Sequence, residues 1–137
     1  MRRPYGGING ARLFFGARLA GPEYLARYRT AGLFLGTLPY NAGTTASDAL
    51  WAGLPVLTCA GESFAGRVAA SLLEAINLPE LITSTPKSYG TLAVQLATNP
   101  VRLVQIRRDP THNRLTARLF ELPQFTTTRE PAYFQLR

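Results

Sequence analysis

Residues 32–59 read GLFLGTLPYNAGTTASDALWAGLPVLTC, and they decide the fold that we expect for this chain of 137 residues. Two short apolar runs, Gly32–Gly36 and Leu54–Cys59, flank a loop of small residues and the segment TTASDALWAG. The glycine that closes this segment and the proline soon after it are typical of a helix end. Near-continuous apolar runs are typical of strands in a parallel sheet that is covered on both faces. The stretch therefore predicts a strand, a loop, a helix and a second strand parallel to the first.

Similar apolar runs at Arg12–Ala17 and Leu81–Thr83 extend the pattern in both directions. Pro22 suits the first turn of a helix in PEYLARYRT, and Thr85-Pro86 and Asn99-Pro100 each resemble a cap followed by proline. An apolar stripe at helical spacing is expected to pack in the core, and it consists of Val68, Ala69, Leu72, Leu73 and Ile76. The sequence as a whole predicts an α/β fold with a doubly wound, Rossmann-like parallel sheet.

The C-terminal third is predicted to be mainly helical, with helices near residues 86–98 and 100–108. The pair Asp109-Pro110 should end the second helix, because proline lacks an N–H group and its ring clashes with the preceding turn. Pro131 falls inside the segment Pro123–Leu136, which would otherwise suit a terminal helix. A break between the second helix and the terminal segment is therefore expected.

Cysteine usage and hydropathy exclude several classes of protein. Cys59 is the single cysteine, so an internal disulfide is impossible, and no cysteine and histidine cluster has the spacing of a metal site. No run reaches the roughly 18 apolar residues that a membrane-spanning helix needs. The N-terminal residues also lack the apolar stretch of a signal peptide. We therefore expect a cytoplasmic protein with no metal site and no membrane partner.

A formal net charge of +7 would suit a polyanionic partner, so nucleic acid is the first alternative to an enzyme. The basic residues are dispersed from Arg2 to Arg137, however, and all of them except Lys87 are arginine. One dense stretch occurs without any RNA- or DNA-binding signature, and it contains Arg102, Arg107, Arg108, Arg114 and Arg118. This pattern favours a solvated basic face. The alternative function is a non-catalytic basic module that binds RNA or an acidic protein.

The loop and helix start in the opening stretch have the residue types of an anion site. Gly43 lets a ligand approach the backbone closely, and Thr44 and Thr45 place hydroxyl and N–H groups where the helix dipole is positive. Asp48, one turn further on, can accept hydrogen bonds from a ribose. The same residues also suit a helix start without a ligand, because threonine caps helices and the dipole favours an acid in the first turn. Residue types alone leave both interpretations open.

A longer string favours the ligand-binding interpretation. Residues 35–73, LGTLPYNAGTTASDALWAGLPVLTCAGESFAGRVAASLL, resemble the bacterial relatives of the O-GlcNAc transferase/Spindly family of glycosyltransferases. The resemblance continues through LPELIT and NRLTARLF to about residue 134. In that family the region is the C-terminal, donor-binding lobe of a GT-B fold, with a helical C-terminal segment. The resemblance implies a partial lobe of this type over residues 12–137. An irregular N-terminal segment is expected over residues 1–11, because Met1–Gly10 contains three glycines and a proline and has no strand or helix pattern.

The resemblance also implies roles for individual residues. Contacts to the pyrophosphate and ribose of a nucleotide sugar fall on Asn41, Gly43, Thr44, Thr45 and Asp48. The family lines the nucleobase with residues that correspond here to Leu19, Gly21 and Tyr24. Gly21 offers no side chain for such a contact. The implied donor is UDP-GlcNAc or a related nucleotide sugar, and relatives differ between UDP- and GDP-linked donors.

The chemistry of the family is a metal-independent, inverting transfer of a sugar from a nucleoside diphosphate to a protein hydroxyl. Helix amides and basic side chains stabilise the departing diphosphate, so neither a cofactor nor a metal ion is implied. The N-terminal catalytic lobe and the helical repeats that bind acceptor proteins in this family lie outside these 137 residues. We therefore expect nucleotide-sugar binding with no catalytic residue in this chain and no transfer by it alone. A separate N-terminal lobe and a protein acceptor are the expected partners.

Overall fold

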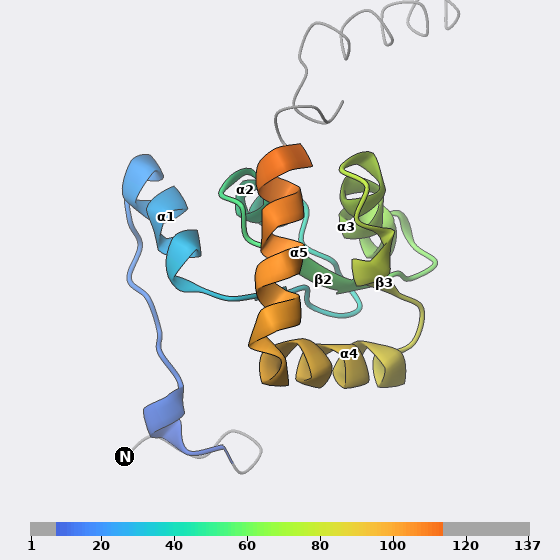
Figure 1. Cartoon of the computed structure of the whole chain (residues 1–137), viewed down its shortest axis with the longest axis horizontal. Coiled ribbons are helices and arrows are strands. Elements are labelled where there is room, and N and C mark those ends of the chain that lie inside the picture. The colour runs from blue at the N-terminus through green and yellow to red at the C-terminus, as the bar shows by residue number, and fades with distance from the viewer. Residues whose placement is uncertain (1–7, 114–137) are drawn as a thin grey trace, which may run out of the picture.

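The computed structural model describes residues 8–113, with side chains described for residues 8–107. A three-stranded parallel sheet forms the centre of the fold, and helices surround it (Figure 1). The strands are β1 (Phe34–Leu35), β2 (Val56–Cys59) and β3 (Ile82–Thr83). The α-helices are α1 (Gly21–Arg27), α2 (Thr44–Trp51), α3 (Phe64–Ala75), α4 (Pro86–Thr98) and α5 (Pro100–Asn113). Short 3-10 helices are η1 (Gly10–Arg12), η2 (Tyr28–Thr30) and η3 (Pro79–Leu81).

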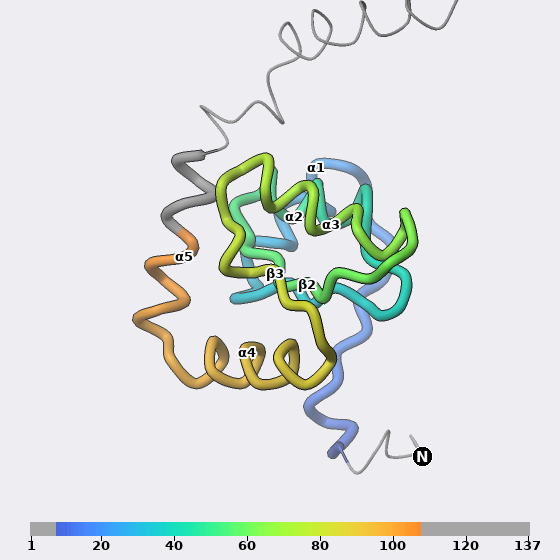
Figure 2. Tube along the Cα trace, turned by 90° about the vertical axis from the view of Figure 1, so that its right-hand side faces the viewer, coloured from blue at the N-terminus to red at the C-terminus, as the bar shows by residue number. Residues whose placement is uncertain are grey.

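Helices lie on both faces of the sheet, so the expected α/β architecture is confirmed. Helices α2 and α3 cover one face and α4 covers the other (Figure 2). Helix α5 follows α4 and runs beside these layers until it contacts α2. The core between the layers is apolar, and its fully buried members include Leu50, Leu54, Val56, Leu73, Ile76, Leu78, Leu81 and Leu96. Within residues 8–113, no helix is both long and apolar enough to cross a membrane.

Strand β2 is the central strand of the sheet, and all of its residues are buried. It pairs in parallel with both neighbours, and the register places Phe34 of β1 opposite Val56 and Ile82 of β3 opposite Thr58. Because the three strands run in the same direction, their carboxyl ends meet at one edge of the sheet. The loops that lead into α2, α3 and α4 all begin at this edge.

The predicted helix ends are confirmed by their capping contacts. Gly53 follows α2 with a φ of 80°, which is the left-handed region that glycine adopts at low cost. Thr85 begins α4 with a capping box, in which its hydroxyl accepts a hydrogen bond from the N–H of Ser88 at 3.1 Å. At the start of α5, Oδ1 of Asn99 accepts a hydrogen bond from the N–H of Arg102 at 3.0 Å. Helix α4 therefore occupies the predicted range.

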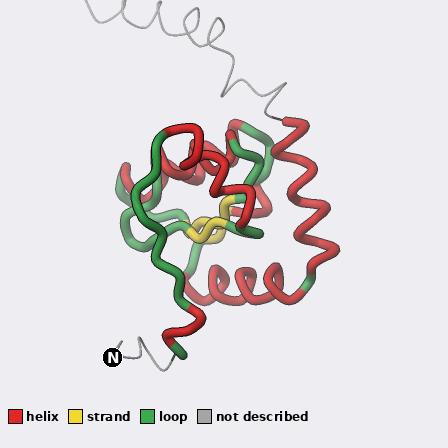
Figure 3. The backbone as a smooth tube through the Cα atoms, turned by 90° about the vertical axis from the view of Figure 1, so that its left-hand side faces the viewer, coloured by secondary structure: helices red, strands yellow, loops and turns green. Residues whose placement is uncertain are grey.

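The strand predicted over Arg12–Ala17 is wrong. Residues 13–20 have no regular structure and run along the outside of the molecule from η1 to α1 (Figure 3). Phe14 is 92% exposed, which a buried strand would not allow. A strand forms only where a neighbour completes its backbone hydrogen bonds, and in the described residues the sheet ends at β1. The apolar composition of this segment was therefore not sufficient to predict a strand.

The predicted break at Asp109-Pro110 is also wrong, because helix α5 continues through Pro110 to Asn113. Proline inside a helix costs about 3 kcal/mol, chiefly through a lost hydrogen bond and a clash with the carbonyl four residues earlier. Pro110 lies in the last turn of α5, so few backbone hydrogen bonds depend on it. Leu103 and Ile106 in the preceding turns hold the helix against the core.

Replacement of Leu73 by alanine should test the core. Leu73 lies on the predicted apolar stripe of α3 and has no exposed surface. We expect Leu73→Ala to lower the free energy of unfolding by about 2–5 kcal/mol, because it leaves a cavity among packed side chains. Urea titration followed by circular dichroism measures the change. Val94→Ala, at an exposed position on α4, is the control and should change stability by less than about 0.5 kcal/mol. Equal effects of the two substitutions would contradict the burial of Leu73 in the core.

Candidate functional site

The candidate site lies at the carboxyl edge of the sheet, where the loop of residues 36–43 leads from β1 into α2. Gly43 occupies the N-cap position of α2, so no side chain caps the first turn. Thr44 and Thr45 in that turn are exposed, and Asp48 is half-buried. N–H groups in the first turn of a helix have no acceptor within the helix, and they form the positive end of its dipole. The start of α2 can therefore receive an anion.

Gly43 leaves the start of α2 open. Its φ is −98°, outside the left-handed region, so the backbone conformation does not require glycine. A Cβ atom at this position would lie 3.5 Å from Cγ1 of Val68, which is an ordinary contact. Packing therefore does not require glycine either. With glycine at the N-cap, no side chain forms a capping hydrogen bond with the first turn of α2.

Asn41 belongs to this loop but is buried, with 1% of the residue exposed. Its Nδ2 atom donates hydrogen bonds to the carbonyl oxygens of Thr37 at 3.2 Å and Cys59 at 3.3 Å. Its Oδ1 atom accepts a hydrogen bond from the hydroxyl of Thr58 at 3.1 Å. The amide of Asn41 is thus directed into the protein, away from the exposed threonines that begin α2.

Tyr24 of α1 and Asp48 of α2, which the sequence assigned to the base and ribose contacts, lie side by side. The Tyr24 hydroxyl donates a hydrogen bond to Oδ2 of Asp48 at 3.2 Å. It also shares a hydrogen bond of 2.5 Å with the hydroxyl of Tyr28, and the two rings meet edge to face. The Tyr28 hydroxyl lies 3.4 Å from the carbonyl oxygen of Thr45. These contacts join α1 to the first turns of α2.

Tyr28 belongs to this group of contacts but was not predicted from the sequence. It stands four positions after Tyr24, a spacing that places both rings on one helix face, and this periodicity is the signal that would have revealed it. Burial raises the pKa of the Tyr28 phenol above its ordinary value, and the hydrogen bond with Tyr24 and the charge of Asp48 raise it further. The phenol is therefore neutral at physiological pH and able to donate a hydrogen bond.

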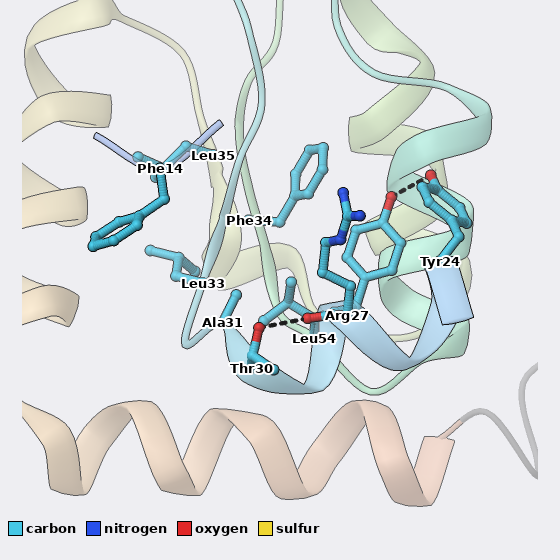
Figure 4. A pocket seen from close by; sticks show the side chains of 10 residues that line it. Phe14, Tyr24, Arg27, Thr30, Ala31, Leu33, Phe34, Leu35 and Leu54 are labelled. Carbon is cyan, nitrogen blue, oxygen red and sulfur yellow. Dashed lines mark hydrogen bonds between the residues drawn. The ribbon is translucent and has the colours of Figure 1, made fainter. Parts of the chain in front are cut away.

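An open pocket of about 780 Å³ lies next to this tyrosine pair (Figure 4). Tyr24 and Arg27 of α1 line one side of it, and Phe14 and Leu33 line the other (Figure 4). Phe34 of β1 contributes an aromatic wall, so the lining combines apolar rings with one guanidinium group. Such a lining suits a flat, partly polar group, because aromatic faces attract rings and cations.

The other two residues assigned to the base contact lie on the surface near the start of α1. Leu19 is exposed in the segment that precedes the helix, and Gly21 is its first residue. A Cβ atom at Gly21 would have no neighbour within 4 Å. The structure therefore brings Tyr24, Thr45 and Asp48 together through hydrogen bonds, and it leaves Leu19 and Gly21 outside that network.

Comparison with known proteins gives consistent matches. Residues 3–128 match the family model described as Glycosyl transferase family 41. A UDP-N-acetylglucosamine--peptide N-acetylglucosaminyltransferase of Caenorhabditis elegans is 34% identical over 130 residues, which are 95% of this chain and 11% of that protein. A probable UDP-N-acetylglucosamine--peptide N-acetylglucosaminyltransferase SPINDLY of Hordeum vulgare is 30% identical over 111 residues, which are 81% of this chain and 12% of that protein.

A solved structure gives the same result for the fold. A mutant of the O-GlcNAc transferase of Thermobaculum terrenum superposes on this chain with a TM-score of 0.87 at 33% identity. The match covers 93% of this chain and 24% of that chain. The chain therefore spans a small part of each relative that it matches, and the resemblance inferred from its sequence is confirmed over that part.

Removal of the Tyr24 hydroxyl should loosen the contact between α1 and α2. We expect Tyr24→Phe to lower the free energy of unfolding by about 1 kcal/mol, because it removes the hydrogen bonds to Asp48 and Tyr28. The pKa of Tyr28 should fall toward its ordinary value. Carbon NMR of isotopically labelled tyrosine rings, followed through an alkaline titration, measures that pKa. Tyr40→Phe, at an exposed position, is the control.

The raised pKa of Tyr28 also fixes the sign of the pH dependence. A raised folded-state pKa contributes stability that is complete below the ordinary tyrosine pKa of about 10 and is lost as pH rises through the folded-state value. In Tyr24→Phe we expect a smaller contribution, lost at lower pH than in the unchanged chain. A Tyr28 titration that is identical in both proteins would contradict the described contact.

Proposed function

Because this chain belongs to glycosyl transferase family 41, we propose that it is the nucleotide-sugar-binding lobe of a protein O-glycosyltransferase. Its Rossmann-like α/β fold is that of the C-terminal lobe of a GT-B enzyme. The proposed donor is UDP-GlcNAc or a related nucleotide sugar, and the proposed acceptor is a protein hydroxyl. The name of the nematode relative, which specifies UDP-N-acetylglucosamine and a peptide, supports both assignments.

The observation that carries this proposal is the open first turn of α2 at the carboxyl edge of the parallel sheet. Ligands of open α/β sheets bind outside the carboxyl ends of the strands, and phosphate groups bind at helix N-termini there. Gly43 provides no side-chain cap, and Thr44 and Thr45 are exposed beside it. We assign the diphosphate to the amides of this turn and to the two threonine hydroxyls.

The nucleoside then extends from α2 toward α1. Asp48 lies one turn from the start of α2 and is held by Tyr24 through one carboxylate oxygen. A carboxylate accepts several hydrogen bonds, so the other oxygen can accept one from a ribose hydroxyl. Tyr24 and the neighbouring residues Leu19 and Gly21 are the proposed surroundings of the base. Tyr24 contacts Asp48 directly, so a nucleotide with its diphosphate at the start of α2 and its ribose at Asp48 would have its base near α1.

The proposed chemistry is electrostatic. As the bond between the sugar and the diphosphate breaks, negative charge grows on the diphosphate, and hydrogen-bond donors already directed at it stabilise the transition state. The N–H groups that begin α2 have this direction. No metal ion or cofactor is part of the proposal. Because the chain spans only part of its relatives, the acceptor site and the base that activates the acceptor are assigned to a separate catalytic lobe.

Titration with UDP and GDP should locate the nucleotide on α2. We expect binding of at least one of them, with the largest amide NMR shifts at Thr44 and Thr45. Asp48→Asn should weaken binding about tenfold, because a hydrogen bond to a charged group contributes about 1.5 kcal/mol or more. Calorimetry provides the affinities. Glu80→Gln is the control, since η3 precedes β3 and Glu80 therefore lies at the opposite edge of the sheet.

Three results of this titration would count against the proposal. The first is no binding of either nucleotide, and the second is equal affinity in the unchanged chain and in Asp48→Asn. The third is strong, salt-dependent binding of generic RNA without any response to UDP or GDP, which would favour the basic-module function instead.

The 137-residue chain should not transfer sugar by itself. A GT-B reaction centre lies between two lobes, and the described residues form one lobe. Incubation with labelled UDP-GlcNAc and a protein acceptor should give incorporation no greater than that of Asp48→Asn. Hydrolysis of the donor, measured by release of UDP, should also stay at the level of this variant. Clear turnover by the unchanged chain would refute the assignment of catalytic groups to another lobe.

A further inference from the structure

The loop that leads into α2 is attached to the protein interior by buried polar groups. Asn41 and Thr58 are the two buried polar side chains among residues 8–107. Thr58 belongs to the central strand β2, and its hydroxyl donates the hydrogen bond that Oδ1 of Asn41 accepts. Burial of a threonine hydroxyl lowers the stability of the fold unless the hydroxyl forms a hydrogen bond. Thr58 and Asn41 provide each other with that hydrogen-bond partner.

Asn41 extends this contact along the loop in two directions. Its Nδ2 atom reaches the carbonyl of Thr37 near the beginning of the loop and the carbonyl of Cys59 at the end of β2. Its backbone N–H donates to the carbonyl oxygen of Ala65 in α3 at 3.1 Å. Asn41 thus connects the loop to strand β2 and to helix α3, and it also bonds two parts of the loop to each other.

Tyr89 holds the same loop from the opposite face of the sheet. It lies on α4, and its hydroxyl donates a hydrogen bond of 2.8 Å to the carbonyl oxygen of Gly36, where β1 ends. Burial raises the pKa of the Tyr89 phenol, so this donor stays protonated. A Cβ atom at Gly36 would lie 3.1 Å from the carbonyl oxygen of Leu57, so the end of β1 is also closely packed on β2.

Between these attachments the loop has little support of its own. Residues 37–40 are exposed, and the described contact within them joins the hydroxyl of Thr37 to the carbonyl of Tyr40 at 2.8 Å. A loop that must become ordered when a ligand binds reduces affinity, and a loop that is already ordered does not. The position of the first amides of α2 therefore depends on the groups that fasten each end of the loop.

We propose that Asn41, Thr58 and Tyr89 are positioning residues that fix the start of α2 for a nucleoside diphosphate, with none of their side chains touching the ligand. The proposal rests on the function assigned above. Asn41 acts through its buried amide, Thr58 by orienting that amide, and Tyr89 by holding the carbonyl at the end of β1. All three act on the loop without reaching its exposed surface.

The test uses conservative variants of the full 137-residue chain. Tyr89→Phe and Thr58→Val each delete one hydroxyl, and Thr58→Ser restores the hydroxyl at that position. Tyr40→Phe deletes a hydroxyl in the exposed part of the same loop and is the matched control. Three measurements are made on each protein: amide NMR shifts of Thr44 and Thr45 without ligand, hydrogen exchange of the Asn41 N–H, and calorimetric affinity for UDP.

We expect Tyr89→Phe and Thr58→Val to shift the two threonine amides and to speed exchange at Asn41. Each should weaken UDP binding by roughly three- to tenfold, the loss that one hydrogen bond predicts. Thr58→Ser and Tyr40→Phe should match the unchanged chain within about twofold, since neither lacks one of the proposed contacts. If Thr58→Val does not fold, Tyr89→Phe is sufficient to test the proposal, because it removes only a half-buried hydroxyl.

A lower melting temperature with unchanged amide shifts, unchanged exchange and unchanged UDP affinity would overturn the proposal, because the network would then serve stability alone. Failure of the unchanged chain to bind either UDP or GDP would refute the nucleotide assignment separately. In that case the ligand-free shifts and the exchange rate still decide whether these three residues position the start of α2. Altered values would support positioning, and unaltered values would reject it.

Discussion

Burial of the central strand β2 is the constraint on which the rest of this structure depends. All of its residues are shielded from solvent, and it pairs with a parallel strand on each side. An apolar strand of this kind requires cover on both faces, which α2 and α3 provide above and α4 below. Parallel pairing then directs the carboxyl ends of all the strands to one edge. The start of α2 lies at that edge because the chain leaves β1 there.

One polar residue within β2 connects the core to the candidate site. A buried hydroxyl without a partner costs about 1–3 kcal/mol, and the described residues contain no buried side-chain oxygen or nitrogen without one. Thr58 meets this requirement through Asn41, which belongs to the loop before α2. The hydrogen bond between Thr58 and Asn41 therefore has two effects: it satisfies the buried hydroxyl, and it fixes the position of the loop.

A second set of contacts reaches the site from α1. Tyr24 and Tyr28 share a hydrogen bond, and together they reach Asp48 and the backbone of Thr45. In the proposed function this arrangement links the surroundings of the base to those of the ribose through the carboxylate of Asp48. The interior network and the tyrosine pair thus fix α2 from two independent directions.

The sequence by itself determined the features that depend on neighbours a few residues apart. Caps, terminating glycines and apolar spacing predicted α2, α3 and the range of α4, and the short apolar runs predicted the three strands of the sheet. The threonines and the aspartate at the start of α2 were found in the same way, because helix-start signals are local. The resemblance to a known family then predicted the lobe, which the comparisons confirm.

Only the tertiary structure decided which distant groups meet. The run Arg12–Ala17 was predicted as a strand, but no strand lies beside it in the described residues, and residues 13–17 are irregular. Asn41 pairs with a residue 17 positions away, and Tyr89 bonds to a carbonyl 53 positions away. Helix and turn signals act over a few bonds of the backbone. Partners at such separations are chosen by the packing of helices on both faces of the sheet, which no local pattern records.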